Sequence, residues 1–384
     1  MNSLAVYGRC GALLAACVLL LASGGGTAVA DDRAPAVAGA GAVVVAGVVT
    51  VPVGTLVSGM AVSPAGDKVY VTADGALKTV DTGTDTVTAQ IPLANAESDY
   101  HQTVISPDGR RVYVVSGLVM NVVDTTTGTL LAAAPLPPQN KPAAWSTGRT
   151  HDIALSADGA TVYVTQAGAT GYNVPPIPPP GVPAETPGRV LTFSTAQNAF
   201  TGEVALPGSY AQSIALRPGG RDAYVAAGSG LVHLDTSGAP GAAPTVVGSV
   251  SNLRQAIRQA AFTPDGTHLF AVADSAANQV FPVDPATDAA QAPVTLAPVA
   301  SAGLTGVSVS PDGTRLRTVR YDRDPRAVAL VAFDTATYAP VPTETVPFTL
   351  DSVSDTAVSA DSSTVYAFGW RNATRDTALQ IVTR

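Results

Sequence analysis

Apolar and polar positions alternate along the chain in short runs, the pattern expected of β-strands that bury one face. One such run covers residues 103–106 and leads into the turn sequence Pro107-Asp108-Gly109, and a second apolar run follows at residues 112–114. Proline presets φ at the first corner of a turn and glycine tolerates a positive φ, so the chain reverses tightly between the two runs. The pattern therefore predicts a β-hairpin.

This hairpin pattern recurs seven times, at steps of 43 to 61 residues. Most units continue with a third apolar run that ends in an aspartate, as at Asp124. Its carboxylate can bond the backbone two residues on and turn the chain into a fourth strand. Four strands repeated at this period are the signature of a β-propeller. The units begin at Ser63, Ser106, Ser156, Arg217, Thr263, Ser310 and Ser359.

The two ends of the repeat array complement one another. The seventh unit stops after its third strand, at residues 379–382, and an unassigned strand-like run precedes the first unit at residues 43–53. Pairing these runs covers an exposed sheet edge and ties the chain ends together. We therefore predict an all-β fold: a seven-bladed β-propeller of four-stranded antiparallel blades, closed by the N-terminal strand completing the last blade, in one domain over residues 43–384. The alternative, a β-sandwich, explains neither the recurring turn nor the truncated last unit.

One unit departs from the repeat inside the predicted core. The second strand of the other six units carries Tyr or Phe at a fixed position. Aromatic and β-branched side chains there suit a face packed against a neighbouring blade. Because Arg317 replaces the aromatic in the sixth unit, we expect that blade to pack differently.

The first thirty residues read as a secretion signal. Arg9 precedes an apolar stretch over residues 11–22, and a run of small residues ends at Ala30. This order predicts a signal peptide over residues 1–30 that is cleaved after Ala30, a flexible segment over residues 31–42, and a secreted protein. The apolar stretch is too short to span a bilayer. The alternative is a lipoprotein anchored through Cys17, because residues 14–17 form a passable lipobox.

Composition and charge exclude several kinds of function. Hydrophobic residues make up 46% of the chain and charged residues only 13%, so a packed core is expected. Both cysteines lie in the predicted signal peptide, which leaves the mature chain without disulfides, thiolate metal ligands or a cysteine nucleophile. The net charge of −8 argues against a nucleic-acid partner. We expect a monomer without a transmembrane segment.

The repeat at residues 106–114, followed by Val122-Val123-Asp124-Thr125, resembles the repeat of YVTN/YncE-type bacterial propellers, which are related to the lactonase-type seven-bladed propellers. The resemblance covers essentially all of the mature chain and implies the same fold. It names no catalytic residue, because the motif lies in turns and packing strands that binding proteins, surface proteins and enzymes share.

Basic and aromatic residues gather in one set of loops. In a propeller, the loops entering each innermost strand and those joining the second and third strands share one rim, around the mouth of the central channel. An Arg and aromatic rim suits an anionic or planar ligand, a glycan or a protein partner. The alternative is that loops are simply where charges go. The predicted ligand-binding residues are Tyr100, Trp145, Arg149, Arg258, Arg320, Tyr321, Trp370 and Arg371.

A ring of polar residues is predicted at the channel mouth, five positions before the first marker residue of each unit. It contains His101 and His151, and Asp152 and Asp355 lie beside it. Imidazoles and carboxylates that converge there can bind a divalent metal or act as acid and base, which makes His101, His151 and Asp152 the candidate catalytic and metal-binding residues. The alternative is that these positions are polar because water fills the channel. The other two histidines are expected to be structural or solvated.

Three functions remain open. The first is a secreted recognition propeller that binds a ligand or partner on the rim, and the second is a lactonase-like hydrolase or lyase with the His and Asp site. The third is an envelope protein that only displays loops. A Pro-rich insertion at residues 166–188 is predicted to be a lid, a docking arm or a solvated loop over the same rim. No Gly-x-Ser-x-Gly, phosphate-binding or His-Glu-x-x-His motif supports a serine hydrolase, nucleotide enzyme or zinc peptidase.

Overall fold

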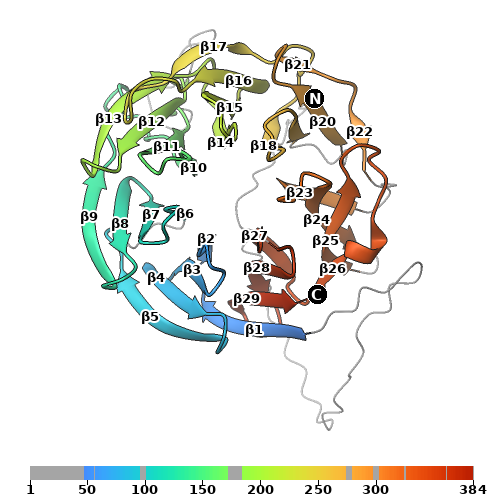
Figure 1. Cartoon of the computed structure of the whole chain (residues 1–384). Helices are drawn as coiled ribbons and strands as arrows, with labels where there is room; N and C mark the ends of the chain where they lie inside the picture. The colour runs from blue at the N-terminus through green and yellow to red at the C-terminus, as the bar shows by residue number, and fades with distance from the viewer. Residues whose placement is uncertain are drawn as a thin grey trace, which may run out of the picture. The chain divides into compact units, whose positions relative to one another are not determined.

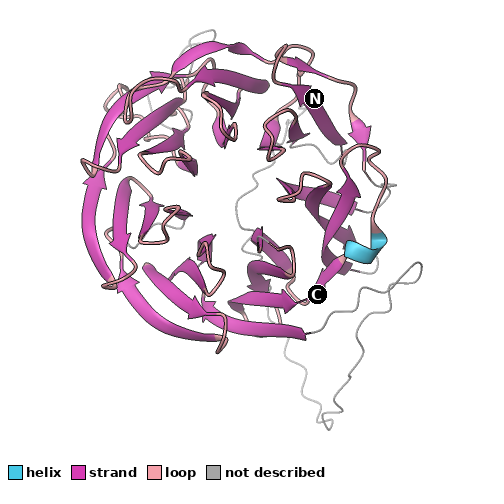
Figure 2. Ribbon diagram, in the orientation of Figure 1, coloured by secondary structure: helices cyan, strands magenta, loops and turns pink. Residues whose placement is uncertain are grey.

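Seven sheets arranged in a ring make up the fold (Figure 1). The computed structural model describes residues 47–55, 57–95, 101–171, 184–273, 279–296, 302–323, 326–359 and 361–383. Within these ranges nearly all regular structure is β-strand, and the one helix is the short 3-10 helix η1 (Pro342–Glu344) (Figure 2). No helix in this part of the chain is long and apolar enough to cross a membrane. The predicted all-β fold with seven blades is confirmed.

Blades 1 to 4 each consist of four consecutive strands, with the first strand innermost and the fourth outermost. Blade 1 contains β2 (Val57–Val62), β3 (Lys68–Ala73), β4 (Ala76–Asp81) and β5 (Thr86–Pro92). Blade 2 contains β6 (His101–Ile105), β7 (Arg111–Ser116), β8 (Val119–Asp124) and β9 (Thr129–Pro135). Blade 3 contains β10 (Thr150–Leu155), β11 (Thr161–Gln166), β12 (Arg189–Ser194) and β13 (Ala199–Ala205). Blade 4 contains β14 (Ala211–Leu216), β15 (Asp222–Ala227), β16 (Gly230–Asp235) and β17 (Thr245–Ser249).

The last three blades are less regular, and the outer strand of blade 5 is split in two. Blade 5 contains β18 (Ile257–Phe262), β19 (Leu269–Ala273), β20 (Gln279–Asp284), β21 (Ala289–Ala290) and β22 (Val294–Thr295). Blade 6 contains β23 (Ala302–Val309), β24 (Arg315–Arg323), β25 (Arg326–Asp334) and β26 (Val346–Phe348). Blade 7 contains β27 (Ser352–Val358), β28 (Thr364–Arg371), β29 (Asp376–Thr383) and, as its outermost strand, β1 (Gly47–Gly54).

The predicted closure of the ring is confirmed, because β1 pairs antiparallel with β29. The end of β1 is also fastened to blade 1. The Asp74 carboxylate accepts bonds from the Thr55 backbone and hydroxyl at 2.9 Å, and Lys78 Nζ donates to the Val53 carbonyl at 2.7 Å. The predicted strand began at residue 43, and residues 43–46 lie outside the described ranges.

The core is divided into seven apolar clusters, one between each pair of neighbouring blades. The second and third strands supply most of it because both of their faces meet another blade; in β11 and β12 every residue is buried. The aromatic of the second strand also reaches the next blade, as where Tyr366 Oη donates to the Gly66 carbonyl at 3.3 Å. Fully burying one such side chain contributes about 1.5–3 kcal/mol.

The two ends of the blades form two distinct faces. We call the side with the loops entering the innermost strands and the turns between second and third strands the channel-mouth face, and the opposite side the hairpin face. The predicted turns build the hairpin face: Gly109 has a φ of +71°, and the Asp108 carboxylate accepts the Ser106 hydroxyl at 2.5 Å. In the next turn the Asp124 carboxylate accepts two backbone N–H groups at 2.8 and 2.9 Å.

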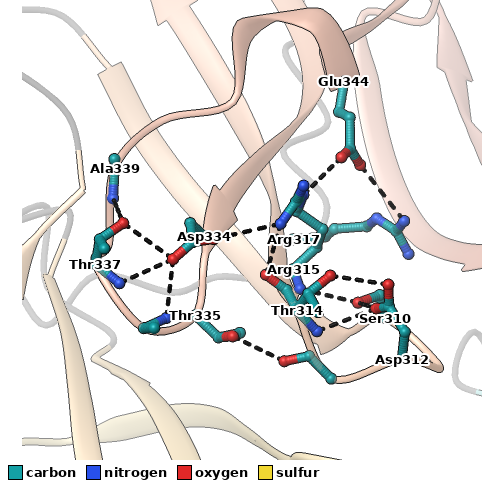
Figure 3. A network of polar contacts seen from close by, with 12 residues as sticks. Ser310, Asp312, Thr314, Arg315, Arg317, Asp334, Thr335, Thr337, Ala339 and Glu344 are labelled. Carbon is teal, nitrogen blue, oxygen red and sulfur yellow. Dashed lines mark hydrogen bonds and ion pairs between the residues drawn. The ribbon is translucent and has the colours of Figure 1, made fainter.

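Blade 6 packs differently at Arg317, as predicted (Figure 3). The Arg317 side chain is buried where the other blades place an aromatic, and its Nη2 atom lies 3.7 Å from Glu344 Oε2. Arg315 Nε donates to the other oxygen of Glu344 at 2.6 Å. The insertion that carries η1 therefore supplies a carboxylate for a guanidinium inside the blade.

Several predictions fall outside the described residues. They concern the signal peptide over residues 1–30, the segment 31–42, Tyr100, and residues 172–183 of the Pro-rich insertion. The base of that insertion is described, and there Gly171 N–H donates to the Ala184 carbonyl at 2.8 Å.

Candidate functional site

Most positions of the predicted polar ring lie at a repeated irregularity of the innermost strands. Among the described residues, six innermost strands carry a β-bulge near the channel-mouth face, each with one extra residue relative to its partner strand. A bulge re-aims side chains and is often placed beside functional sites. The bulged positions are Ser58, His151, Gln212 with Ser213, Arg258, Gly306 with Val307, and Ser354.

Residues beside the bulges form hydrogen bonds that connect neighbouring blades. Asp152 Oδ2 in blade 3 accepts the Ile214 N–H of blade 4 at 3.0 Å, and its Oδ1 accepts the Ile153 N–H at 2.8 Å. Gln259 Oε1 in blade 5 accepts the Val307 N–H of blade 6 in the same way, at 3.1 Å. The candidate catalytic residue Asp152 thus has a structural task in the ring.

Asp355 lies at the equivalent place in blade 7 and is less engaged. Its Oδ1 accepts the Thr356 N–H at 2.8 Å, and no bond to its other oxygen is formed by the described residues. Enclosure by the ring raises the pKa of both Asp152 and Asp355 to about 7, and the charge of Asp355 adds to the shift of Asp152. Water reaches the exposed Asp355 and screens part of its shift.

His151 is a half-buried imidazole at the channel mouth. Burial lowers its pKa, and the positive charge of Arg149 lowers it further. Its ring lies 6.0 Å from the Tyr210 ring, centroid to centroid, at an interplanar angle of 47°. Blades 3 and 4 therefore bring two aromatic rings together beside the ring axis.

The sequence analysis missed Tyr210 as a site residue. Tyr210 is 37% exposed, and its phenol oxygen accepts a bond from Gln212 Nε2 at 2.5 Å. The signal that would have found it is its place in the loop entering β14, two residues before the ring position Gln212.

Trp145 is a packing residue of the blade 3 loops. Its ring lies against Gly171, where an added Cβ would come within 2.4 Å of the indole Nε1. Isolated bridges join Ser146 to Thr170 and Thr170 to Glu185, so the loops before β10 and β12 support one another. Trp145 is half-buried in this arrangement, which removes much of its ring from contact with a ligand.

Two of the predicted rim arginines are already paired with carboxylates. Arg320 lies 3.0 Å from Asp322, and Arg371 makes a two-point contact with Asp376 at 2.9 and 2.5 Å. Such pairs cancel much of the positive potential that the sequence suggested. Arg149 and Arg258 lie on blades 3 and 5, away from this group.

A shallow pocket of about 230 Å³ lies where blade 6 meets blade 7. Arg326 borders it with 66% of its side chain exposed, and its Nη2 is 3.9 Å from Asp351, a loose pair. Tyr321 forms part of the wall, and its phenol donates to the Val353 carbonyl at 2.7 Å and accepts the Val353 N–H at 2.9 Å. Trp370 is joined to this wall because its carbonyl accepts the Asp351 N–H at 2.8 Å. Tyr321 and Arg326 thus line this pocket, and Trp370 is connected to it only through its backbone carbonyl.

The predicted metal grouping of His101, His151 and Asp152 is only partly described. The backbone of His101 pairs with Ser116 at the start of β6, and its side chain lies outside what the structure describes. Within the described part of the chain, no three His, Cys, Asp or Glu side chains are grouped as a metal site requires. A metal at this position stays a prediction that depends on His101.

The remaining histidines lie away from the channel mouth, as expected, and His268 is exposed to solvent. His233 Nδ1 lies 2.8 Å from Asp288, and its ring stacks on Tyr224 at 4.7 Å between centroids. His268 Nδ1 lies 2.9 Å from the Thr267 hydroxyl on the hairpin face. Neither histidine approaches the channel mouth.

Comparison with known proteins supports the fold. No protein-family model matches the chain, and no curated protein matches it. A chain of the hydrazine synthase of Kuenenia stuttgartiensis has a similar structure, with a TM-score of 0.61 and 16% identity over 85% of this chain and 95% of that chain. At this identity the likeness concerns the fold alone, and the resemblance to YVTN/YncE-type repeats stays a prediction.

Proposed function

We propose that this protein is a secreted recognition module that binds a small ligand, a glycan or a protein partner on its channel-mouth face. The observation that carries the proposal is the pocket between blades 6 and 7, which the loosely paired Arg326 and the aromatic Tyr321 line together. A guanidinium beside aromatic rings is a recurrent centre of binding interfaces. Secretion after cleavage behind Ala30, with anchoring through Cys17 as the alternative, belongs to the same proposal.

The test is a thermal-shift screen of small anions, glycans and peptides. A ligand present at 100 times its Kd raises the free energy of unfolding by about 2.7 kcal/mol, because it binds only the folded state. We expect Arg326→Gln to reduce the shift for ligands of the blade 6 and 7 pocket. Arg110→Gln is the matched control, an exposed arginine on the hairpin face. Shifts that persist in every channel-mouth variant and vanish in Arg110→Gln would refute the proposal.

A second candidate is a lactonase-like hydrolase or lyase. The observation that favours it is Asp152, next to the half-buried His151 and with its pKa raised to about 7, because an acid or base with a pKa near the working pH transfers protons most effectively. Elemental analysis of protein purified without chelator, alongside His101→Ala, tests the metal-dependent form. Near-stoichiometric metal that is lost in the variant, with turnover of a lactone or related ester, would support it; metal in neither protein would remove that form.

A further inference from the structure

The pocket between blades 6 and 7 contains a guanidinium whose hydrogen-bonding capacity is mostly unused. The Arg326 side chain donates one long hydrogen bond, from Nη2 to the Asp351 carbonyl at 3.4 Å, and forms no other with the described residues. Its Nη2 atom lies 3.9 Å from Asp351 Oδ1, which is beyond hydrogen-bond distance. A guanidinium has five N–H donors and holds a carboxylate best through two of them. Because 66% of its side chain is exposed, Arg326 can take up a carboxylate that enters the pocket.

Asp351, on the other side of this loose pair, is held in place before any ligand arrives. Its backbone N–H donates to the Trp370 carbonyl at 2.8 Å, and its Oδ2 atom accepts the Asn372 N–H at 2.7 Å. Its side chain lines the pocket and is 29% exposed, and its Oδ1 atom accepts no hydrogen bond from the described residues. Preorganisation of this kind lowers the cost of binding, because little must be ordered when the ligand enters. Asp351 therefore offers a fixed, accessible acceptor to a cationic group.

The charged residues described around the pocket balance in sign. Asp322 also lines it, but Arg320 Nη2 lies 3.0 Å from its Oδ2 atom and offsets its charge. Arg326 and Asp351 offset one another without a hydrogen bond between their side chains. Like charges repel, so Asp351 disfavours a purely anionic ligand and Arg326 disfavours a purely cationic one. A ligand that carries both charges close together can pair with each residue.

The rest of the pocket is small and partly apolar. The Tyr321 ring forms part of the wall and is fixed there, because its phenol oxygen bonds both the N–H and the carbonyl of Val353 at 2.9 and 2.7 Å. Ala327 adds a methyl group to the same wall. The volume of about 230 Å³ lies below the roughly 300–1,000 Å³ of sites for drug-sized ligands. The pocket therefore suits one small molecule with an apolar part beside its charged groups.

We propose that this pocket binds a free α-amino acid with an apolar side chain. The carboxylate of the amino acid pairs with the Arg326 guanidinium, its ammonium group donates to Asp351 Oδ1, and its side chain packs on the Tyr321 ring. An α-amino acid carries both charges on groups attached to one carbon, which suits a guanidinium and a carboxylate that lie 3.9 Å apart. A neutral glycan or an internal peptide segment lacks this pair of charges. The inference rests on the proposed recognition function and names its ligand class.

The experiment titrates the full chain with L-leucine and L-phenylalanine by calorimetry and saturation-transfer NMR. Each amino acid is compared with its methyl ester, which lacks the carboxylate, and with its deaminated acid, which lacks the ammonium group. We expect at least one of the two amino acids to bind. Its ester and its deaminated acid should each bind at least about 10-fold more weakly, because each leaves one charge of the pocket without its partner.

Two substitutions assign the charges to their residues. Arg326→Gln should weaken binding of the amino acid at least about 10-fold and should not weaken binding of the methyl ester, which has no carboxylate to lose. Asp351→Asn should weaken binding of the amino acid to a similar extent and should not weaken binding of the deaminated acid. The asparagine keeps an acceptor for the Asn372 N–H. A residue with only a structural role would weaken all three ligands alike.

Arg254→Gln is the matched control, an exposed arginine in the loop entering β18 on the same face, and should bind amino acids as the unchanged protein does. The inference is overturned if neither amino acid binds, if the ester or the deaminated acid binds equally well, or if binding survives both Arg326→Gln and Asp351→Asn. A ligand of the thermal-shift screen that binds through Arg326 while amino acids do not would overturn the amino-acid assignment and leave the recognition function standing. If neither the amino acids nor any ligand of that screen binds, both are overturned.

Discussion

The hairpin face and the channel-mouth face use aspartate in opposite ways. In the hairpin turns, the hydroxyl of Ser359 bonds Asp361 and backbone N–H groups add to it, which lowers the pKa of Asp361 to about 2. At the channel mouth, enclosure raises the pKa of Asp152 to about 7 even though two N–H groups bond its carboxylate. Local hydrogen bonds dominate where water is plentiful, and desolvation dominates inside the ring. The first arrangement builds the fold, and the second leaves titratable groups where a ligand can reach them.

The largest effect is expected on the hairpin side of blade 6. Arg317→Ala should lower the free energy of unfolding by about 3 kcal/mol, because it leaves a buried site unfilled and removes one partner of Glu344. Arg317→Tyr, which restores the aromatic of the other blades, should lower the free energy of unfolding by less. Urea unfolding measures both. An alanine variant as stable as the unchanged protein would mean that the pair of Arg317 and Glu344 adds nothing to stability.

The next effect concerns the loop packing of blade 3 on the channel-mouth face. Gly171→Ala should displace the Trp145 ring and cost about 1–3 kcal/mol, because the added methyl group overlaps the indole. Tryptophan fluorescence and thermal unfolding report the two consequences together. Gly248→Ala is the control, since an added Cβ there meets nothing within 4 Å. An unchanged emission spectrum in Gly171→Ala would contradict this packing.

A smaller effect is expected on the pH dependence of stability. The raised pKa of Asp152 means that the folded protein holds a proton at pH values where the unfolded chain has lost it, so stability falls as pH rises from about 4 to about 7. Asp152→Asn should flatten this part of the stability curve and keep the acceptor for Ile214. Melting temperatures across this range provide the measurement. A variant with the same slope as the unchanged protein would assign the slope to other groups.

The smallest effect has the opposite sign. Because the pKa of Asp361 is lowered to about 2, its contribution is present above about pH 4 and is lost as pH falls toward 2. Asp361→Asn should reduce the acid sensitivity of the melting temperature slightly and leave the neutral range nearly unchanged. Greater acid sensitivity in this variant would contradict the assignment. Ligand binding is expected to stay the same.

The fold could be predicted from the sequence because its signals are short turn motifs and repeated units whose number can be counted. Gly109 and Asp124 form hydrogen bonds with residues only a few positions away, so each turn can be recognised from the sequence of its own unit. The closure of the ring could be predicted because the seventh unit lacks its fourth strand. The polar ring at the channel mouth could also be located, because the fixed spacing from each turn places His151 and Gln212 at equivalent positions of their blades.

The candidate site was less predictable, because its decisive contacts join residues from different loops. The packing of Trp145 on Gly171 and the pairing of Arg320 with Asp322 appear only when the chain is folded. Tyr210 was missed since the loops entering the innermost strands differ in length and share no register. Gln212 Oε1 and Ser213 Oγ are buried without a hydrogen bond to the described residues, which depends on how the chain folds and not on sequence spacing.

The pairing of β1 with β29 also constrains the order in which the protein can be made. Gln380 Nε2 bonds Thr50 Oγ1 at 3.3 Å across 330 positions of sequence. Strand β1 therefore has no partner until β29 has been synthesised. Blades 1 to 6 can form in turn while the ring stays open, and the exposed edges of an open ring invite aggregation. Completion of the ring thus waits for the synthesis of β29, and the exposed edge of blade 7 is covered only when β1 pairs with it.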